Sequence, residues 1–248
     1  DVALHINFGP QARRDDKFPE TRMGLITQLR QALLDAQNYE ERKTRGETEE
    51  EQEGERRGFK RDLKLEAFLP YLKREKPVVV GAQTASDIKT IMRLLGDFNL
   101  RIVLNHITYA QDILDEIAAW KVPVLVGPIY SAPREEQRYD TIFRLPAELH
   151  KRGVLFAFQS DDAHNVRNLP YQAGYAVAWG LPYEEALKAL TIYPARIFGA
   201  ENQVGSLEVG KLANVVVADG DPLEPRTLVK HVFIKGREVP LDNYQLRL

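Results

Sequence analysis

From Pro77 onward, short apolar strands alternate with amphipathic helices, and this alternation constrains the fold more than any other feature of the sequence. It predicts strands at 78–80, 102–104, 122–126 and 154–158, with helices at 85–98, 110–120 and 144–151 between them. Strands separated by helices of this length need crossover connections, which make neighbouring strands parallel. Each predicted strand is apolar without alternation, as expected when helices cover both faces of the sheet. The sequence therefore predicts an α/β fold.

The chain before Pro77 has a different pattern of apolar and charged residues. Residues 2–8 alternate apolar and polar side chains and predict a strand, whereas residues 23–39 carry apolar side chains at helical spacing, with Thr21 as the expected N-cap. From residue 40 to residue 66 charged residues of both signs dominate, and large apolar residues are almost absent. This composition is typical of a solvated helix or a flexible excursion, so we expect a surface insertion without a chemical role.

The C-terminal part of the chain changes character again. Two further helices are predicted near 169–179 and 183–190. Beyond them, Gly, Pro and short β-branched runs at 204–207, 214–218 and 229–235 indicate a small β unit.

Composition excludes several classes of protein. The 248 residues carry 34 Lys and Arg against 36 Asp and Glu, and the net charge of -2 gives no general attraction to polyanions, so we expect no nucleic-acid partner. No apolar run approaches the roughly 18–20 residues that cross a bilayer, so we expect a soluble protein without a membrane partner. The absence of cysteine excludes disulfides and thiolate ligands, but it leaves the compartment open between the cytoplasm and an exported location.

Polar residues follow the predicted parallel strands where each strand ends. Chemistry in such folds gathers at the carboxyl ends of the strands, where loops and helix N-termini meet. The residues so placed are His5, Gly81, Gln83, Asn105, His106, Ser160, Asp161, Asp162 and His164. His106 and Asp161 end different strands, and imidazole with carboxylate suits Zn, Fe or Mn. Two alternatives stay open: His106 can be a hydrogen-bonded histidine at a strand end, and Asp161 can be the N-cap of a following helix.

The C-terminal part carries the most specific resemblance to a known family. It contains LPYQAGYAVAWGLPYEEALKALTIYPARIFG (169–199), VGSLEVGKLANVVVADGDPL (204–223) and VKHVFIKGREV (229–239). Upstream segments with the same resemblance are PETRMG (19–24), ASDIKTIMRL (85–94) and VPVLVGP (122–128). In these segments the sequence resembles the amidohydrolase superfamily, in particular its imidazolonepropionase-like and prolidase-like members.

The resemblance implies the C-terminal part of a (β/α)8 TIM barrel together with the C-terminal strands of a small β-sandwich. Residues 1–199 would form the partial barrel, about strands four to eight with the charged insertion at 40–66, and residues 200–248 the sandwich segment. A closed barrel needs eight strands, and an open apolar edge promotes aggregation. We therefore expect the missing N-terminal half of the barrel to come from another chain or from an earlier segment of the same precursor, and the protein to be an oligomer. The start at Asp1, not Met, agrees with this expectation.

The resemblance also implies a metal-dependent hydrolase acting on carbon–nitrogen bonds of amide, lactam or peptide-like substrates, non-peptide ahead of peptide. Asp161 in FAFQSDD matches the family's strand-eight aspartate, which takes a proton during catalysis, and His106 in IVLNHIT matches the strand-six histidine. His5 falls where many relatives place a metal-bridging lysine, and Gly81 falls where they place a strand-five histidine. The implied metal ligands are therefore His106, Asp161 and His5, with Zn expected ahead of Fe or Mn. We expect one ion or none, because other family ligands are absent.

The segment after Asp161 offers candidate contacts to a small-molecule substrate, His164 and Arg167, although both residues can equally shape or solvate the loop. The sequence does not define the substrate. Since His5 and Gly81 replace ligands, an alternative is a catalytically silent amidohydrolase-like subunit that stabilises or regulates an active partner. A third hypothesis, small-molecule binding without chemistry, has no positive feature in the sequence.

Overall fold

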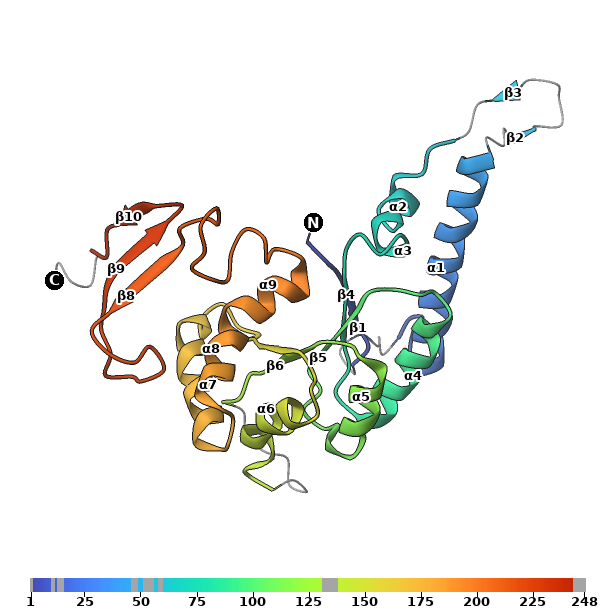
Figure 1. Cartoon of the computed structure of the whole chain (residues 1–248). Helices are drawn as coiled ribbons and strands as arrows, with labels where there is room; N and C mark the ends of the chain where they lie inside the picture. Colours follow the sequence, from blue (N-terminus) through green and yellow to red (C-terminus); the bar gives the residue numbers. More distant parts are fainter. Residues whose placement is uncertain are drawn as a thin grey trace. The chain divides into compact units, whose positions relative to one another are not determined.

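A computed structural model describes residues 2–9, 12, 16–45, 49–50, 56–57, 60–130 and 138–242 of the chain. The chain divides into two compact units, Asp1–Leu104 and Asn105–Leu248, and each is described by itself. In both units, strands alternate with helices (Figure 1). The division predicted between residues 199 and 200 lies inside the second unit and stays a prediction.

Parallel strands form the centre of the first unit. β1 (Leu4–Asn7) pairs in parallel with β4 (Val78–Gly81), which places His5 opposite Val79. β5 (Ile102–Asn105) lies beside β4, where the N–H of Val78 donates to the carbonyl of Arg101 at 2.8 Å. All residues of β4 are buried, which explains an apolar strand without alternation. The strands predicted in these three places are confirmed.

Helices pack beside these strands in the first unit. They are α1 (Arg22–Arg45), α2 (Leu63–Glu66), α3 (Leu69–Leu72) and α4 (Ala85–Gly96). Two-residue strands β2 (Glu49–Glu50) and β3 (Arg56–Arg57) form an antiparallel pair after α1. Thr21 caps α1 as predicted, since its Oγ1 accepts a hydrogen bond from the N–H of Gly24 at 3.1 Å. Side chains that are fully buried between helices and strands include Leu33, Ala36, Ile88, Ile91 and Leu95.

The carboxylates of Glu40 and Glu66 hold the charged segment predicted at 40–66 to the unit, Glu40 through Lys73 Nζ at 2.8 Å. Glu66 accepts hydrogen bonds from the Tyr39 hydroxyl at 3.1 Å, from Lys43 Nζ at 2.8 Å and from Arg61 Nε at 2.6 Å. Tyr39 itself is only 1% exposed. The prediction of a solvated helix holds for the end of α1, where the side chains are exposed, whereas 46–48, 51–55 and 58–59 lie outside the described residues.

The second unit contains a parallel pair covered by helices. β6 (Val124–Val126) pairs in parallel with β7 (Phe156–Phe158), and all six residues are buried. The helices of this unit are α5 (Leu114–Trp120), α6 (Thr141–Lys151), α7 (Leu169–Ala178), α8 (Tyr183–Leu190) and α9 (Ile192–Phe198). The strands predicted at 122–126 and 154–158 are confirmed with shorter bounds, and the predicted helices are found. The mixed α/β fold with parallel strands is thus as expected.

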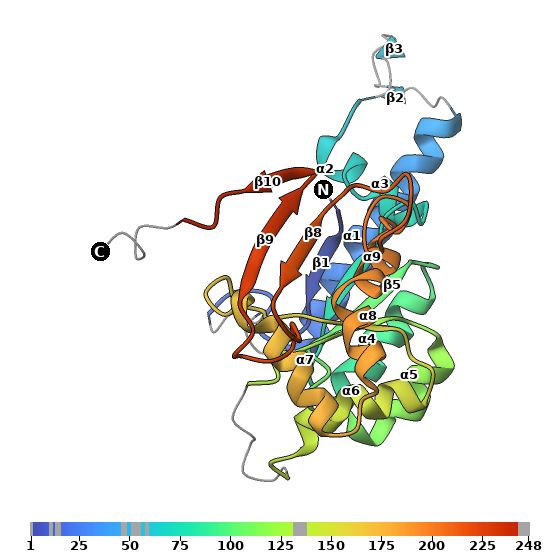
Figure 2. The same ribbon diagram turned by 60° about the vertical axis from the view of Figure 1, so that its left-hand side comes forward.

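The C-terminal residues of the second unit form a separate antiparallel sheet in the order β10-β9-β8 (Figure 2). Its strands are β8 (Val215–Ala218), β9 (Val229–Ile234) and β10 (Arg237–Val239), of which β10 was not predicted. The strand predicted at 204–207 is wrong. Gly205 has a φ of +97°, and a Cβ on it would lie 2.9 Å from Cβ of Ala195, so this segment turns tightly against α9. That the sheet forms half of a β-sandwich stays a prediction.

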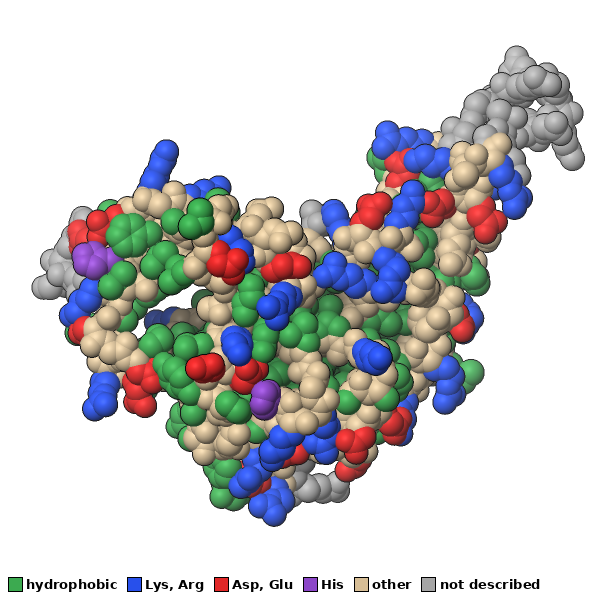
Figure 3. Space-filling view, in the orientation of Figure 1, with side chains coloured by type: hydrophobic (Ala, Val, Ile, Leu, Met, Phe, Trp, Pro, Cys, Tyr) green, Lys and Arg blue, Asp and Glu red, His purple; other side chains and the backbone are tan. Residues whose placement is uncertain are grey.

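The surface carries charges of both signs. Basic and acidic side chains are interspersed over the face shown in Figure 3. Among the described residues, none of the helices combines the length and the apolarity that a bilayer-spanning segment requires.

Glu66 makes the stability of the first unit depend on pH. Hydrogen bonds from Lys43 and Arg61 lower the pKa of its carboxyl from 4.5 to about 2. Because the folded-state pKa is the lower one, the stabilisation is complete above about pH 4.5 and is lost as the pH falls towards 2. We expect Glu66→Gln to lower the thermal midpoint by a few degrees at pH 7, with the difference from the wild type shrinking at pH 2–3. Glu20→Gln, at an exposed position, is the matched control; an equal effect of both substitutions would contradict the assignment.

Gly174 of α7 allows the segment after β8 to pack on the helices. A Cβ on Gly174 would lie 2.7 Å from the carbonyl oxygen of Leu223, whose side chain is 5% exposed. We expect Gly174→Ala to destabilise the protein by about 1–3 kcal/mol in denaturant unfolding, because the added methyl forces this segment away. Gly96→Ala, at the end of α4 with nothing within 4 Å of the new Cβ, should be neutral or stabilising. Equal midpoints for the two variants would refute the contact.

Candidate functional site

Two residues predicted to act together lie side by side in the second unit. His106 follows β5, and Asp161 lies in the turn after β7. Nε2 of His106 is 3.5 Å from Oδ1 of Asp161. The imidazole is 22% exposed and the carboxylate 52%, so both groups are accessible from solvent while the histidine is partly enclosed. The pair can share a proton or bind a cation between its two facing atoms.

Both residues have left-handed backbone conformations. The φ angle is 60° at His106 and 53° at Asp161. Positive φ is uncommon for residues other than glycine, although His and Asp tolerate it better than most. Such strained positions need support from their surroundings, and they cluster at functional sites. The two strand ends thus share an uncommon backbone conformation, which also occurs at Arg74, Asn99, Lys121 and Lys235.

An amide network supports His106 from behind. Oδ1 of Asn105 accepts a hydrogen bond from the N–H of His106 at 2.8 Å and another from Nε2 of Gln159 at 2.7 Å. The same Nε2 donates to the carbonyl of Gly127 at 3.0 Å. Asn105 is only 8% exposed, so these hydrogen bonds satisfy a polar group that water scarcely reaches.

Gly127 permits the ends of β6 and β7 to approach closely. Its φ is +138°, and a Cβ at this position would collide with the carbonyl oxygen of Gln159. No other residue type combines this conformation with the absence of a side chain. The glycine thus determines where Gln159, and with it the following turn, can lie.

The turn after β7 is organised by Asp162, not by Asp161. Its Oδ1 accepts the N–H of His164 at 2.7 Å, and its Oδ2 accepts Nδ2 of Asn165 at 2.7 Å. Asp161 is not the N-cap considered as its alternative role, since the next helical turn, Val166–Asn168, has Asn165 at that position, and the Asp161 carboxylate faces His106. His164 and Arg167 are both exposed, and their proposed contact with a substrate stays a prediction.

The third predicted ligand, His5, lies in the first unit. Its backbone is on β1, and it lines a groove of about 270 Å3 with Phe8, Leu25 and Phe68. Gly81 ends β4, buried, and its carbonyl accepts the N–H of Phe8 at 2.7 Å. His5 and Gly81 therefore each occupy a defined position in the first unit.

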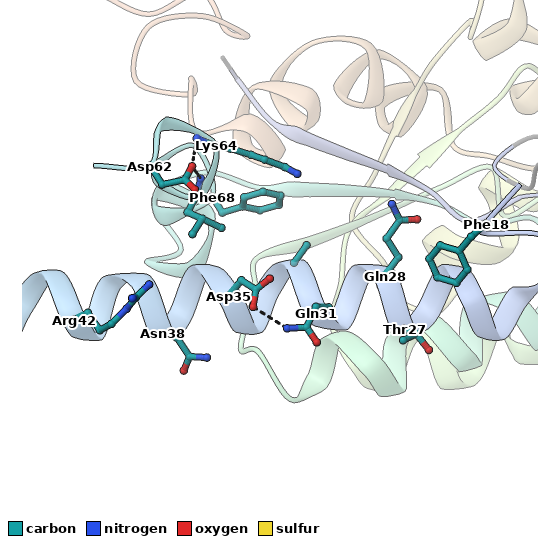
Figure 4. Close-up of a pocket in the computed structure, with 12 residues that line it drawn as sticks. Phe18, Thr27, Gln28, Gln31, Asp35, Asn38, Arg42, Asp62, Lys64 and Phe68 are labelled. Carbon is teal, nitrogen blue, oxygen red and sulfur yellow. Dashed lines mark hydrogen bonds between the residues drawn. The ribbon is translucent and has the colours of Figure 1, made fainter. Parts of the chain in front are cut away.

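A larger groove of about 830 Å3 lies along α1 and α2 of the first unit (Figure 4). Its lining is a mixture of apolar and charged side chains, and it contains none of the predicted site residues. Asp35 is bonded to Gln31 at 2.7 Å, and Asp62 caps α2 through the N–H of Lys64 at 2.9 Å. Gln31, Asp35 and Asp62 of this groove thus have structural roles.

The His106–Asp161 pair fits two corners of a metal site. With metal–ligand distances of about 2.0–2.2 Å, two ligands of a tetrahedral ion lie about 3.3–3.6 Å apart. The observed 3.5 Å between Nε2 and Oδ1 falls in this range. No group of three or more His, Cys, Asp or Glu residues that could hold an ion occurs in the described part of the chain. The pair is therefore compatible with a metal, but a complete ligand set needs a further donor.

The comparisons with known proteins point to the amidohydrolase family. Residues 46–239 match the family model described as the amidohydrolase family. The solved structure of an amidohydrolase from Thermotoga maritima MSB8 has a TM-score of 0.84 and 32% identity, and the match covers 96% of this chain and 62% of that chain. Amidohydrolase tasK of Hapsidospora irregularis is 25% identical over 180 residues, which are 71% of this chain and 18% of that protein.

A 5-methylthioadenosine/S-adenosylhomocysteine deaminase of Thermoanaerobacter pseudethanolicus is 28% identical over 138 residues, 51% of this chain and 31% of that protein. The chain thus spans less than a third of the length of these two curated relatives.

Sequence reasoning found the His106–Asp161 pair but missed two residues that support it, Gln159 and Gly127. Position at the end of a strand, which singled out Asn105 and Asp161, applies equally to Gln159. The Gly-Pro dipeptide after β6 indicated a turn but not a close approach to the next strand.

Substitutions of Asp161 and Asp162 should have different effects on the turn after β7. Asp162→Ala removes the acceptor of the His164 N–H, a hydrogen bond with a net stabilisation of about 1 kcal/mol, so exchange of this amide should become about fivefold faster. Asp161→Asn serves as the neighbouring control and should leave it unchanged, since the His164 N–H donates to Asp162 and not to Asp161. Amide exchange measured by NMR distinguishes them; equal acceleration in both variants would show that the turn does not depend on Asp162.

Proposed function

Because this chain belongs to the amidohydrolase family, we propose that it is the C-terminal portion of a metal-dependent hydrolase that cleaves carbon–nitrogen bonds of amide, lactam or related small molecules. The single observation that carries this proposal is the 3.5 Å approach of His106 Nε2 and Asp161 Oδ1 beyond the ends of β5 and β7. Histidine and aspartate are residue types that both bind metal and transfer protons.

In the proposed site, His106 and Asp161 hold one divalent ion, with Zn preferred over Fe or Mn. When bound, such an ion supplies Lewis-acid polarisation of the scissile group and lowers the pKa of water. Asp161 has a second task, because its 52% exposed carboxylate can accept a proton from the attacking water and deliver it to the leaving nitrogen. His106 is more enclosed and has its main chain fixed by Asn105, which suits a ligand of constant position.

The ligand set of the proposed site needs completion. Catalytic zinc normally has three protein ligands and an open position. Gly81 offers no ligating side chain, and the role of His5 as a ligand stays a prediction. We propose that the remaining donor comes from the N-terminal part of the barrel, supplied by another chain or by another segment of the precursor.

The open surfaces of the two units support such a partner. Among the described residues of the first unit, β1 pairs with β4 alone, which leaves its other edge available to a further strand. In the second unit, the small sheet leaves apolar side chains exposed: Val216 at 59%, Val217 at 42%, Val229 at 46% and Ile234 at 53%. Apolar sheet surface of this kind is normally covered by another layer. An oligomer or a longer precursor would provide the cover.

Metal analysis of the protein together with its N-terminal barrel partner tests the proposal. We expect about one equivalent of Zn, Fe or Mn, lost on dialysis from His106→Ala and Asp161→Asn at least tenfold more readily than from the wild type. Asn is chosen at position 161 because it tolerates the positive φ. The matched control is His231→Ala, on the exposed face of β9, which should retain the metal.

Hydrolysis should fall with the metal in the two site variants. The absence of metal from the wild type, or unchanged metal content in both variants, would contradict the proposal. Unchanged activity of the partner in both variants would favour a catalytically silent subunit instead.

A further inference from the structure

We propose that Gln159 is a positioning residue for the His106–Asp161 pair: its side-chain amide holds Asn105, and through Asn105 the backbone of His106, in the arrangement that brings the two groups together. This inference rests on the proposed function for its chemical meaning. The geometry that carries it is separate, because it consists of hydrogen bonds among Gln159, Asn105, Gly127 and the main chain of His106.

The hydrogen bonds fix the orientation of both amides. The N–H of His106 requires an acceptor, so the atom of Asn105 that faces it is Oδ1. The group that approaches the same Oδ1 at 2.7 Å must then be a donor, which is Nε2 of Gln159. This Nε2 also meets the carbonyl of Gly127 at 3.0 Å, so its two hydrogens both face oxygen acceptors. Neither amide can be reversed without placing like groups against each other.

The absence of a side chain at Gly127 leaves space for the Gln159 side chain to reach Asn105. The Gln159 side chain starts at the end of β7 and passes Gly127 at the end of β6 before reaching the last residue of β5. A Cβ on Gly127 would lie 3.5 Å from Cγ of Gln159 and would collide with its carbonyl oxygen. One glutamine thus joins three strand ends, and two of them carry the candidate catalytic pair.

The positive φ of His106 explains why this support matters. The left-handed conformation at 60° is unfavourable by itself, and the hydrogen bond from the His106 N–H to Asn105 is part of what stabilises it. Without Gln159 the Asn105 side chain is free to rotate away, and His106 can relax to an ordinary conformation. The imidazole would then leave its place beside Asp161.

The test uses one substitution that removes the hydrogen-bond donors of Gln159 and one that retains donors. Gln159→Met keeps the length of the side chain but has no donor, whereas Gln159→Lys keeps donors that can reach both oxygens. Gln203→Met applies the same change at an exposed position of the same unit. The full chain is examined in two ways: amide exchange of His106 by NMR, and Zn2+ titration by calorimetry. The N–H of Gln159 itself, bonded to Val126 at 2.9 Å, reports whether the β6–β7 pairing survives.

We expect Gln159→Met to accelerate exchange of the His106 amide by about fivefold or more, while the Gln159-position amide stays protected. Zn2+ affinity should fall about 10–100-fold, as for other residues that orient a ligand. Gln159→Lys should restore most of both properties, and Gln203→Met should change neither.

The outcomes separate this inference from the proposed function. If the wild type binds no Zn2+, the metal site of the proposed function fails, and His106 exchange alone decides on Gln159. Unchanged His106 exchange in Gln159→Met overturns the positioning role whatever the metal does. Faster exchange at both amides also overturns it, because the residue would then stabilise the strands in general.

Discussion

The ends of β6 and β7 meet backbone to backbone at Gly127, and the candidate site depends on this close approach. A side chain at this position would collide with the carbonyl of Gln159. With glycine there, the amide of Gln159 reaches across to Asn105, and Asn105 holds the N–H of His106. The contact between Gly127 and Gln159, which involves no catalytic group, thus determines where the imidazole of His106 can lie. Substitution-sensitive positions in this protein therefore need not contact a substrate.

Conformational strain and chemistry coincide at the same two residues. His106 and Asp161 have positive φ, and their side chains are also the pair that can bind metal or transfer a proton. For His106 the strain is offset by a buried hydrogen bond, and for Asp161 the next residue builds the turn that follows. The unstrained alternatives would turn both side chains elsewhere. Since strain of this kind reduces stability unless it is supported, its presence at both members of the pair argues for a functional constraint on the site.

The parts of the fold that depend on burial were predictable from sequence. β4 and β7 are apolar throughout because both faces are covered, and such a run of apolar residues can be recognised in the sequence alone. The strand predicted at 204–207 contains the apolar residues Val204 and Leu207, but Gly205 packs against α9 and turns the chain, which is a tertiary contact. β10 was missed because its sequence, Arg237–Val239, is short and mostly polar; pairing with β9 defines it.

The same distinction applies to the site. Parallel strands bring their carboxyl ends to one edge, so His106 and Asp161 could be selected from position alone. Position at a strand end applies equally to Gln159, but its role could not be predicted, since it arises from two acceptors supplied by residues 54 and 32 positions away. Which of the adjacent aspartates organises the turn was likewise not readable from the sequence, because aspartates before a turn offer the same cap. Only the direction of each carboxylate distinguishes them.

Two independent shortfalls of the chain have the same remedy. The proposed metal site has two facing ligands where catalytic zinc normally has three, and the strand edge at β1 and the apolar face of the small sheet lack cover among the described residues. Further ligands within the chain would complete the metal site but would not cover the exposed sheet surfaces. An unrelated protein could cover those surfaces but would not complete the metal site. In the proposed assembly, the N-terminal part of the barrel would supply strands and ligands together. We therefore propose that completion of the fold and completion of the metal site are one event, so that the proposed hydrolysis would depend on assembly.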